Sequence, residues 1–410
     1  MPDPRAAPTS LWNRNFLIWW LGSAQSALGS ALAGIATSFL VLHQTGSAGA
    51  MGVNLALSLL PALLSPLFGT LMDRLPVRLP LVVGNLLRAA LQLGVGLAAL
   101  RGHVPLEVLH AVAFLTGLVG AFYGPASMGV TPRLVPPSEL QRAGGLMQGT
   151  SQTMNMVGLV GGGLFVAHFG SGAALVFDGA TFLLFGLLLT LVRFPTGRAK
   201  AAAETFWQSF TGGLGYVRGS AMLVGLPLIA LLINASFAPL EMLLPKRMIA
   251  LEAGAAGYGL FWGLELAGIA LGSFGIAWLG ERVNPRRLSV LGLAGLGAVV
   301  VALSLAASPG PMYALAALMG LTSAMTNLSI SVLFQKRVDP VYYGRVGSLL
   351  GMVGMAGQPL TLLLLAPVAD RVPISLVFAV AGVVTLLGAV VWEAVLRREP
   401  ASIPPPAVPA

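Results

Sequence analysis

The sequence contains no cysteine, which excludes disulfide bonds and thiolate metal sites and leaves the redox compartment undetermined. Charged residues are also scarce, because Asp, Glu, Lys and Arg make up only 9% of the 410 residues, against about 25% in soluble domains. Hydrophobic residues make up 56%. The chain has too little polar surface to cover a water-soluble globule, so the composition indicates an integral membrane protein.

The segments expected to be aqueous contain no P-loop, no Gly-x-Ser-x-Gly sequence and no His-rich metal spacing. We therefore expect no enzymatic activity and no cofactor, and an ion gradient as the energy source. The net charge of +9 would suit a nucleic acid, but its distribution fits a membrane surface instead. We expect no nucleic-acid partner.

Long apolar runs follow one another along the chain. About 20 apolar residues are needed to cross a bilayer as a helix, and twelve such runs are present. The sequence therefore predicts an all-α integral membrane protein with twelve transmembrane helices. The runs fall near residues 15–42, 47–72, 79–100, 106–131, 142–168, 171–193, 220–248, 254–280, 288–307, 311–334, 345–370 and 372–396.

Lysine and arginine gather between alternate runs, which fixes the expected orientation. With the N-terminus inside, most of the 23 basic residues fall in cytoplasmic segments, as the positive-inside rule requires. We expect a multi-pass protein of the inner (plasma) membrane with both termini cytoplasmic. We expect it to be a monomer.

Two matching charged hairpins indicate an internal repeat. Asp73-Arg74-Leu75-Pro76-Val77-Arg78 and Glu281-Arg282-Val283-Asn284-Pro285-Arg286 each separate two apolar runs, about half a chain length apart. Halves of this kind commonly move against each other around a central site in transporters. The predicted domains are 1–193 and 220–396, both six-helix bundles, with a cytoplasmic linker 194–219 and a disordered cytoplasmic tail 397–410. Within the linker, Glu204–Tyr216 is either a surface-lying amphipathic segment or part of a simple tether.

The hairpins and several other motifs resemble the major facilitator superfamily. Gly69-Thr-Leu-Met-Asp73-Arg74-Leu-Pro-Val-Arg78 is similar to its signature loop, and Glu281-Arg282 resembles the degenerate second copy. The chain resembles the branch of drug, macrolide and siderophore exporters at three motifs: Arg14-Asn15-Phe16, Phe122-Tyr-Gly-Pro125-Ala126 and Asp178-Gly-Ala-Thr-Phe182. The resemblance implies a gating role for Gly69, Asp73, Arg74, Arg78, Glu281 and Arg282.

Two departures from this branch bear on coupling. The antiporter-associated Gly-Pro sequence of the fifth span is Gly158-Leu159 here, and Ser30 stands where branch members often have an acid. Both argue that proton coupling is absent or uses another ion.

Ionisable residues inside apolar runs are expensive and are therefore functional candidates. Glu265 and Glu241 lie on runs that the family uses to line its cavity, so we predict them as proton-coupling residues. Arg88 and Asp178 lie on runs that the family places at the periphery, and we expect a structural role for them.

Polar residues at helical spacing predict an aqueous pathway, with aromatic residues supplying an apolar lining. For each single residue, a hydrogen bond between helices is an equal alternative. The predicted substrate cavity comprises Gln25, Tyr123, Gln148, Gln152, Asn155, Asn234, Phe237, Trp262, Asn327 and Gln358.

Transport is the function that these patterns favour. The leading hypothesis is proton-coupled export of an amphiphilic small molecule, such as a drug, macrolide or siderophore, by alternating access. The expected partners are that molecule, protons or another coupling ion, and the lipid bilayer. A lipid or lysolipid flippase is an alternative, and a non-transporting membrane receptor is a more distant one.

Overall fold

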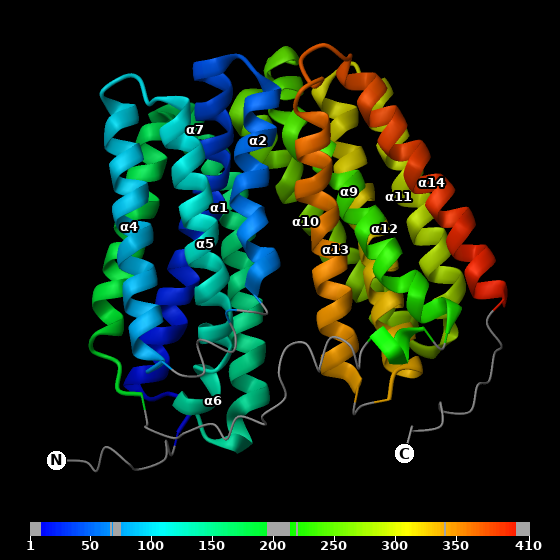
Figure 1. Cartoon of the computed structure of the whole chain (residues 1–410), viewed down its shortest axis with the longest axis horizontal. Coiled ribbons are helices and arrows are strands. Elements are labelled where there is room, and N and C mark those ends of the chain that lie inside the picture. Colours follow the sequence, from blue (N-terminus) through cyan, green and yellow to red (C-terminus); the bar gives the residue numbers. More distant parts are fainter. Residues whose placement is uncertain are drawn as a thin grey trace. The chain divides into compact units, whose positions relative to one another are not determined.

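The computed structural model describes residues 10–65, 68, 75–194, 214–218, 220–339 and 342–398. All regular secondary structure in these ranges is helical (Figure 1). Contacts divide the chain into two compact units. Unit 1 comprises Met1–Ala203 with Ala253–Leu260, and unit 2 comprises Glu204–Glu252 with Phe261–Ala410.

Unit 1 is built from four long helices and several short ones. The elements are α1 (Arg14–Thr45), α2 (Ala48–Leu59), the 3-10 turn η1 (Leu60–Leu64), α4 (Arg78–Leu100), α5 (Leu106–Met128), α6 (Thr131–Leu134), η2 (Pro137–Glu139) and α7 (Leu140–Leu189).

Unit 2 repeats this all-helical plan. Its elements are α9 (Ala221–Ala250), α10 (Gly254–Leu279), η3 (Gly280–Arg282), α11 (Pro285–Leu305), α12 (Pro309–Arg337), α13 (Tyr343–Leu365) and α14 (Ile374–Arg398). The first residues of α10, up to Leu260, are grouped with unit 1.

The helices account for the twelve predicted spans. Among the described residues, ten helices are long and apolar enough to cross a membrane, and Ala48–Leu64 is a shorter apolar stretch. One of the ten, α7, contains two spans, because Gly170 breaks it with φ 79° and ψ 167°. The predicted boundary between the fifth and sixth runs falls at this glycine.

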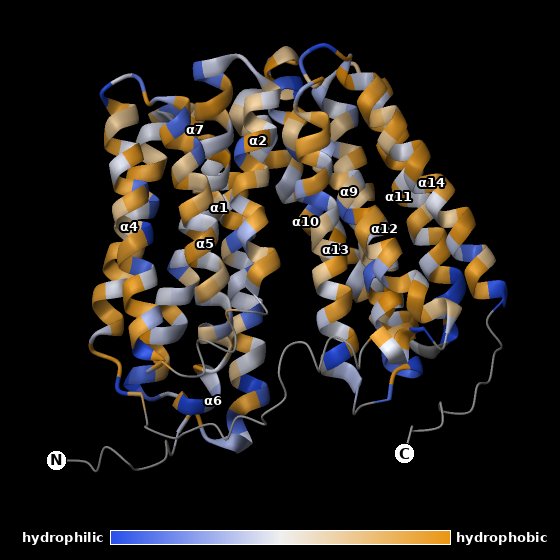
Figure 2. Cartoon of the chain, in the orientation of Figure 1, coloured by the Kyte–Doolittle hydropathy of each residue, from blue (hydrophilic) through white to orange (hydrophobic). Residues whose placement is uncertain are grey.

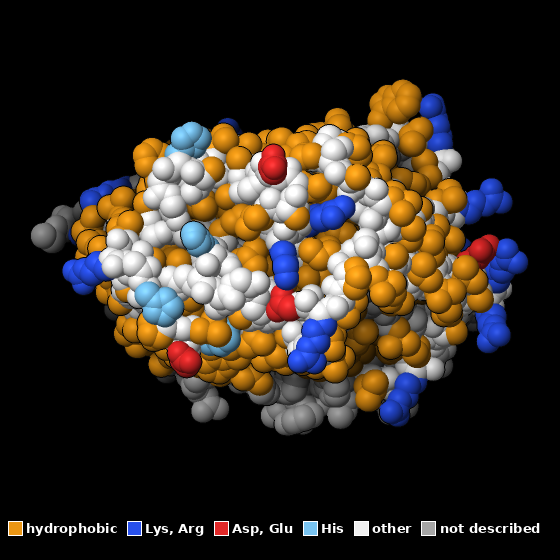
Figure 3. All heavy atoms as spheres, turned by 90° about the horizontal axis from the view of Figure 1, so that it is seen from above, with side chains coloured by type: hydrophobic (Ala, Val, Ile, Leu, Met, Phe, Trp, Pro, Cys, Tyr) orange, Lys and Arg blue, Asp and Glu red, His pale blue; other side chains and the backbone are white. Residues whose placement is uncertain are grey.

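The outer sides of the helices are suited to lipid. On α10, Leu271, Phe274 and Trp278 are 70%, 76% and 80% exposed. They form a contiguous apolar stripe, which soluble proteins rarely expose to water. Hydrophobic residues cover the length of the helices in Figure 2, whereas the end face in Figure 3 carries histidine, basic and acidic side chains scattered among hydrophobic ones. This distribution is that of a membrane protein.

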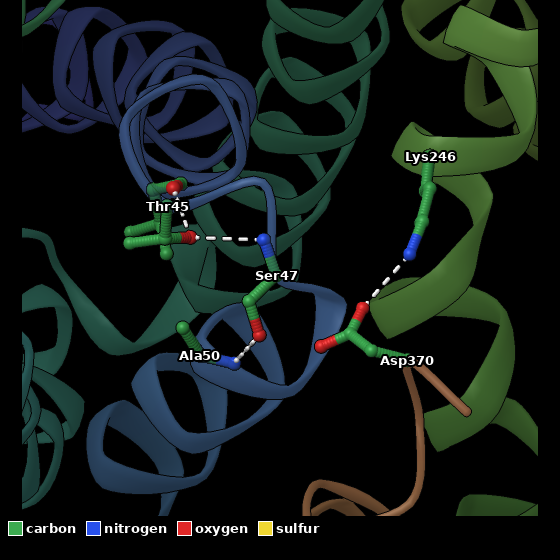
Figure 4. A network of polar contacts seen from close by, with 6 residues as sticks. Thr45, Ser47, Ala50, Lys246 and Asp370 are labelled. Carbon is green, nitrogen blue, oxygen red and sulfur yellow. Dashed lines mark hydrogen bonds and ion pairs between the residues drawn. The ribbon is translucent and has the colours of Figure 1, made fainter.

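Side-chain caps set several helix starts. Asn13 Oδ1 accepts a hydrogen bond from Phe16 N at the start of α1, and Ser220 Oγ accepts one from Leu223 N at the start of α9. At α2, Ser47 Oγ accepts a hydrogen bond from Ala50 N at 3.0 Å (Figure 4). Such caps satisfy amide groups that a helix end leaves unpaired.

Glycines let the helices approach closely, and the two units repeat the same contacts. A Cβ on Gly96 of α4 would lie 3.0 Å from the carbonyl oxygen of Gly172 on α7. In unit 2, a Cβ on Gly297 of α11 would lie 2.9 Å from the carbonyl oxygen of Gly382 on α14. Small residues permit such backbone contact in membrane bundles. The repeat agrees with two pseudo-symmetric six-helix bundles.

Some expectations fall on residues that the structure does not describe. Residues 195–213 of the predicted linker, including most of Glu204–Tyr216, lie outside the described ranges. The helix α14 continues to Arg398, so the first two residues of the predicted tail are helical, and 399–410 are not described. The predicted domain boundaries stay a prediction.

Candidate transport site

The two predicted coupling acids belong to unit 2. Gln358 Nε2 on α13 donates a hydrogen bond of 2.6 Å to Glu241 Oε2 on α9. Glu265 on α10 is 7% exposed and lies close enough to Glu241 for the two carboxyl groups to interact. In the described part of the chain, no ion pair involves either glutamate. The site therefore brings two carboxyl groups and one amide together from three helices.

Close packing of α10 against α12 fixes the backbone at Glu265. A Cβ on Gly320 would lie 1.9 Å from the carbonyl oxygen of Glu265 and 2.7 Å from Ile269 N. One turn away, a Cβ on Gly268 would lie 2.1 Å from the carbonyl oxygen of Ala317. Neither glycine leaves room for a side chain, so the backbone of α10 at Glu265 is in direct contact with α12.

Unit 1 contains a similar close contact, at a residue that is not acidic. A Cβ on Gly117 of α5 would lie 2.1 Å from the carbonyl oxygen of Ser58, which follows the same pattern as Gly320 and Glu265. Ser58 thus makes a backbone contact of the same kind as Glu265, but its side chain is a hydroxyl and not a carboxyl group.

Aromatic side chains lie next to Glu265 in the sequence of α10. The rings of Phe261 and Trp262 are 5.4 Å apart in an edge-to-face arrangement. Phe261 is fully buried, whereas Trp262 and Phe237 are half-buried. Trp262 and Phe237, both predicted to line the cavity, therefore retain surface that a ligand can contact.

Two other predicted cavity residues of unit 2 bond within their own helices. Asn234 Nδ2 donates to the carbonyl oxygen of Ala230 at 2.9 Å, and Asn327 Nδ2 donates to that of Ser323 at 3.0 Å. Each amide keeps its carbonyl oxygen as an acceptor. Their assignment to the substrate cavity stays a prediction.

The predicted cavity residues of unit 1 divide into two groups. Gln25 Nε2 on α1 donates to the carbonyl oxygen of Thr181 on α7 at 2.9 Å, and the Tyr123 ring packs under the Arg88 guanidinium at 5.1 Å. These two side chains connect helices within the unit. The second group lies on α7 and is exposed or half-buried: Gln148, Gln152 and Asn155.

The predicted gate is described only in part. Gly69, Asp73 and Arg74 lie outside the described residues, as does the side chain of Glu281. Arg78 is exposed and its Nη2 donates to the carbonyl oxygen of Thr190, at the end of α7. Arg282 is exposed in η3. The contact of Arg78 joins α4 to α7 at one end of unit 1.

The ion pair between Lys246 and Asp370 joins two residues that no sequence motif marks. Lys246 Nζ lies 2.8 Å from Asp370 Oδ1, with both side chains about one-third exposed (Figure 4). It connects α9 to the loop that follows α13. The two residues are 124 positions apart, and no local pattern links them.

The described residues contain no cluster of three or more His, Cys, Asp or Glu that would hold a metal ion.

Apolar helices with buried carboxyl and amide groups, arranged in two similar units, define a multi-pass membrane transporter. The Major Facilitator Superfamily profile matches residues 19–268 and 242–408. The chain belongs to this superfamily.

Named relatives include exporters. Macrolide efflux protein A of Streptococcus pyogenes is 25% identical over 93% of this chain and 95% of its own length. The multidrug efflux pump Tap of Mycobacterium bovis is 29% identical over 87% of each chain. Among solved structures, the nucleoside transporter NupG superposes with a TM-score of 0.76 at 14% identity, covering 94% of this chain and 100% of that one. The structural likeness shows the fold.

Proposed function

We propose that this chain is a proton-coupled exporter of amphiphilic small molecules, a class that includes drugs, macrolides and siderophores. The observation that carries the proposal is the pair Glu265 and Glu241 in unit 2. An ionised carboxylate inside a membrane is costly without a partner, and neighbouring carboxylates repel when both are charged. A site of this kind favours binding of at least one proton.

In this proposal, proton binding at Glu241 depends on the hydrogen bond that Gln358 donates to it. An amide that donates to a carboxylate stabilises its charged form. Substrate that displaces this donor changes how readily the glutamate keeps its charge, and protonation in turn changes how well the site accepts substrate. Competition of this kind is what antiport requires, because each ligand must bias a different state of the protein.

The names of the relatives support export of large amphiphiles. Macrolide efflux protein A and the pump Tap align over most of this chain. The half-buried rings of Phe237 and Trp262 provide apolar surface, which suits adaptable binding of such molecules. We assign substrate contact to them together with Gln25, Tyr123, Gln148, Gln152, Asn155, Asn234, Asn327 and Gln358.

Alternating access supplies the movement. In this proposal the halves 1–193 and 220–396 rock about the central site, with both termini cytoplasmic and a single chain as the working unit. Gly69, Asp73, Arg74, Arg78, Glu281 and Arg282 hold the cytoplasmic side closed in one state.

Transport in proteoliposomes tests the proposal. After a thermal-shift screen of macrolides, siderophores and lysolipids, the best ligand is followed under an imposed pH gradient, with and without a protonophore. We expect gradient-driven accumulation in the wild type and in the control Glu393→Gln, whose carboxyl is about half exposed and pairs with Arg397 near the end of α14. We expect Glu265→Gln to bind the ligand but not to concentrate it.

Two results contradict the proposal. Accumulation by Glu265→Gln at the wild-type rate shows that this acid does not couple transport. Movement of lysolipid without any response to the pH gradient favours the flippase alternative.

A further inference from the structure

A cavity lined by both apolar and polar residues lies inside unit 1, whereas Glu265 and Glu241 belong to unit 2. It has a volume of about 280 Å³ and is lined by residues of α1, α2, α4, α5 and α7. Its lining includes two charged residues, Arg88 and Asp178, with Asn54, Gln92 and Thr116 among the polar ones. A water molecule takes up about 30 Å³ in the liquid, so the cavity has room for several.

Four buried polar atoms of the lining have no hydrogen-bond partner among the described residues. They are Asn54 Oδ1, Arg88 Nε, Thr116 Oγ1 and Asp178 Oδ1. Asp178 is fully buried and Asn54 is 4% exposed. Buried polar groups are almost always bonded to protein, water or a ligand. Four orphaned atoms around one cavity therefore point to hydration or a small polar ligand.

Asp178 is bonded through only one of its oxygens. Gln92 Nε2 on α4 donates to Asp178 Oδ2 at 3.0 Å, while Oδ1 has no partner. A proton on Oδ1 leaves Oδ2 as a carbonyl oxygen, which still accepts the Gln92 hydrogen bond. The local geometry thus accommodates both the charged and the neutral carboxyl group.

Arg88 has partners that do not depend on the charge of Asp178. Its guanidinium lies over the rings of Tyr123 at 5.1 Å and Phe182 at 5.4 Å. The absence of a side chain at Gly120 makes room for it, because a Cβ there would lie 2.9 Å from Arg88 Nη2. Cation–π contacts stabilise a desolvated guanidinium, so neutralising Asp178 does not leave Arg88 unsupported.

We propose that Asp178 is a second proton-binding site, reached through a hydrated cavity in unit 1, with Gln92 and Arg88 as positioning residues. A hydronium ion in the cavity transfers its proton to Asp178 Oδ1 and leaves as water. Arg88 of α4 and Tyr123 of α5 are the charged or titratable groups nearby. The lining residues from α1 and α2 carry only hydroxyl, amide or apolar side chains.

Proton binding at Asp178 does not require the proposed function, but any contribution to export rests on it. Infrared difference spectroscopy of the full chain in lipid nanodiscs, across a pH titration, measures this binding without transport. We expect a carboxylic acid band that disappears as the pH rises, and we expect Asp178→Asn to lack it. Glu107→Gln, which changes an exposed carboxyl in the first turn of α5, should retain it. A spectrum of the Asn variant identical to the wild type overturns the proposal.

A second variant keeps the test decisive if Asp178→Asn does not fold. Gln92→Leu preserves the carboxyl group but removes its amide donor, so we expect the midpoint of the band to move by about half a pH unit. An unchanged midpoint overturns the proposal. Glu265→Gln in the same titration should remove a different band, so that failure of the unit 1 site and failure of the proposed coupling site are seen separately.

Discussion

Replacement of Gly320 by alanine tests how the packing of α10 on α12 holds Glu265. The added Cβ would lie 1.9 Å from the carbonyl oxygen of Glu265, whereas carbon and oxygen atoms in contact lie about 3.3 Å apart. The helices must therefore separate by about 1.4 Å at this level. Overpacking of this kind costs about 1–3 kcal/mol.

Gly275→Ala is the matched control, because it adds the same methyl group to α10 at a position with no heavy atom within 4 Å. Both variants gain about 1 kcal/mol of helix propensity, so the difference between them isolates the packing cost. Unfolding in mixed detergent micelles, followed by tryptophan fluorescence, gives the two free energies of unfolding. We expect Gly320→Ala to be less stable than Gly275→Ala by about 1–3 kcal/mol. Equal stability of the two variants would refute the close contact.

Three further predictions concern a hydrogen bond, an ion pair and the predicted gate. Trp392→Phe removes the indole donor that lies 2.9 Å from Ser289 Oγ and should lower the free energy of unfolding by about 1–2 kcal/mol, which chemical unfolding measures; an unchanged value would contradict it. Lys246→Met should cost less than about 1 kcal/mol, because its ion pair with Asp370 is about one-third exposed; a loss that persists in high salt would show that the pair matters more. Asp73→Asn should slow transport while the protein stays folded, and spin-label distances at the cytoplasmic helix ends should shift; an unchanged distribution with normal flux would reduce Asp73 to a topological anchor.

Much of the fold was predictable because membrane spans leave a strong local signal. Twelve apolar runs, two charged hairpins and the break at Gly170 are visible in the sequence. The close glycine contacts were not predictable from the sequence, because the partners of Gly96 and Gly320 lie 50 or more residues away and glycine is frequent throughout the chain.

The side-chain partners within the site were also beyond the sequence. Helical spacing placed Gln25 and Gln358 on polar faces, but spacing does not distinguish a residue that bonds to Thr181 from one that bonds to Glu241. The sequence also did not reveal the surroundings of Arg88 and Asp178, whose structural roles stay a prediction. Their surroundings depend on the cavity formed by five helices, which no single segment encodes.

Coupling between substrate and proton is the central claim, and it is tested most directly by measuring the proton movement that a ligand gradient drives. Proteoliposomes containing a pH-sensitive dye are given a gradient of the ligand from the thermal-shift screen and no pH gradient. The wild type should drive protons in the opposite direction to the ligand, and Glu265→Gln should bind the ligand without moving protons. Ligand movement by the wild type with no change in internal pH would contradict the account.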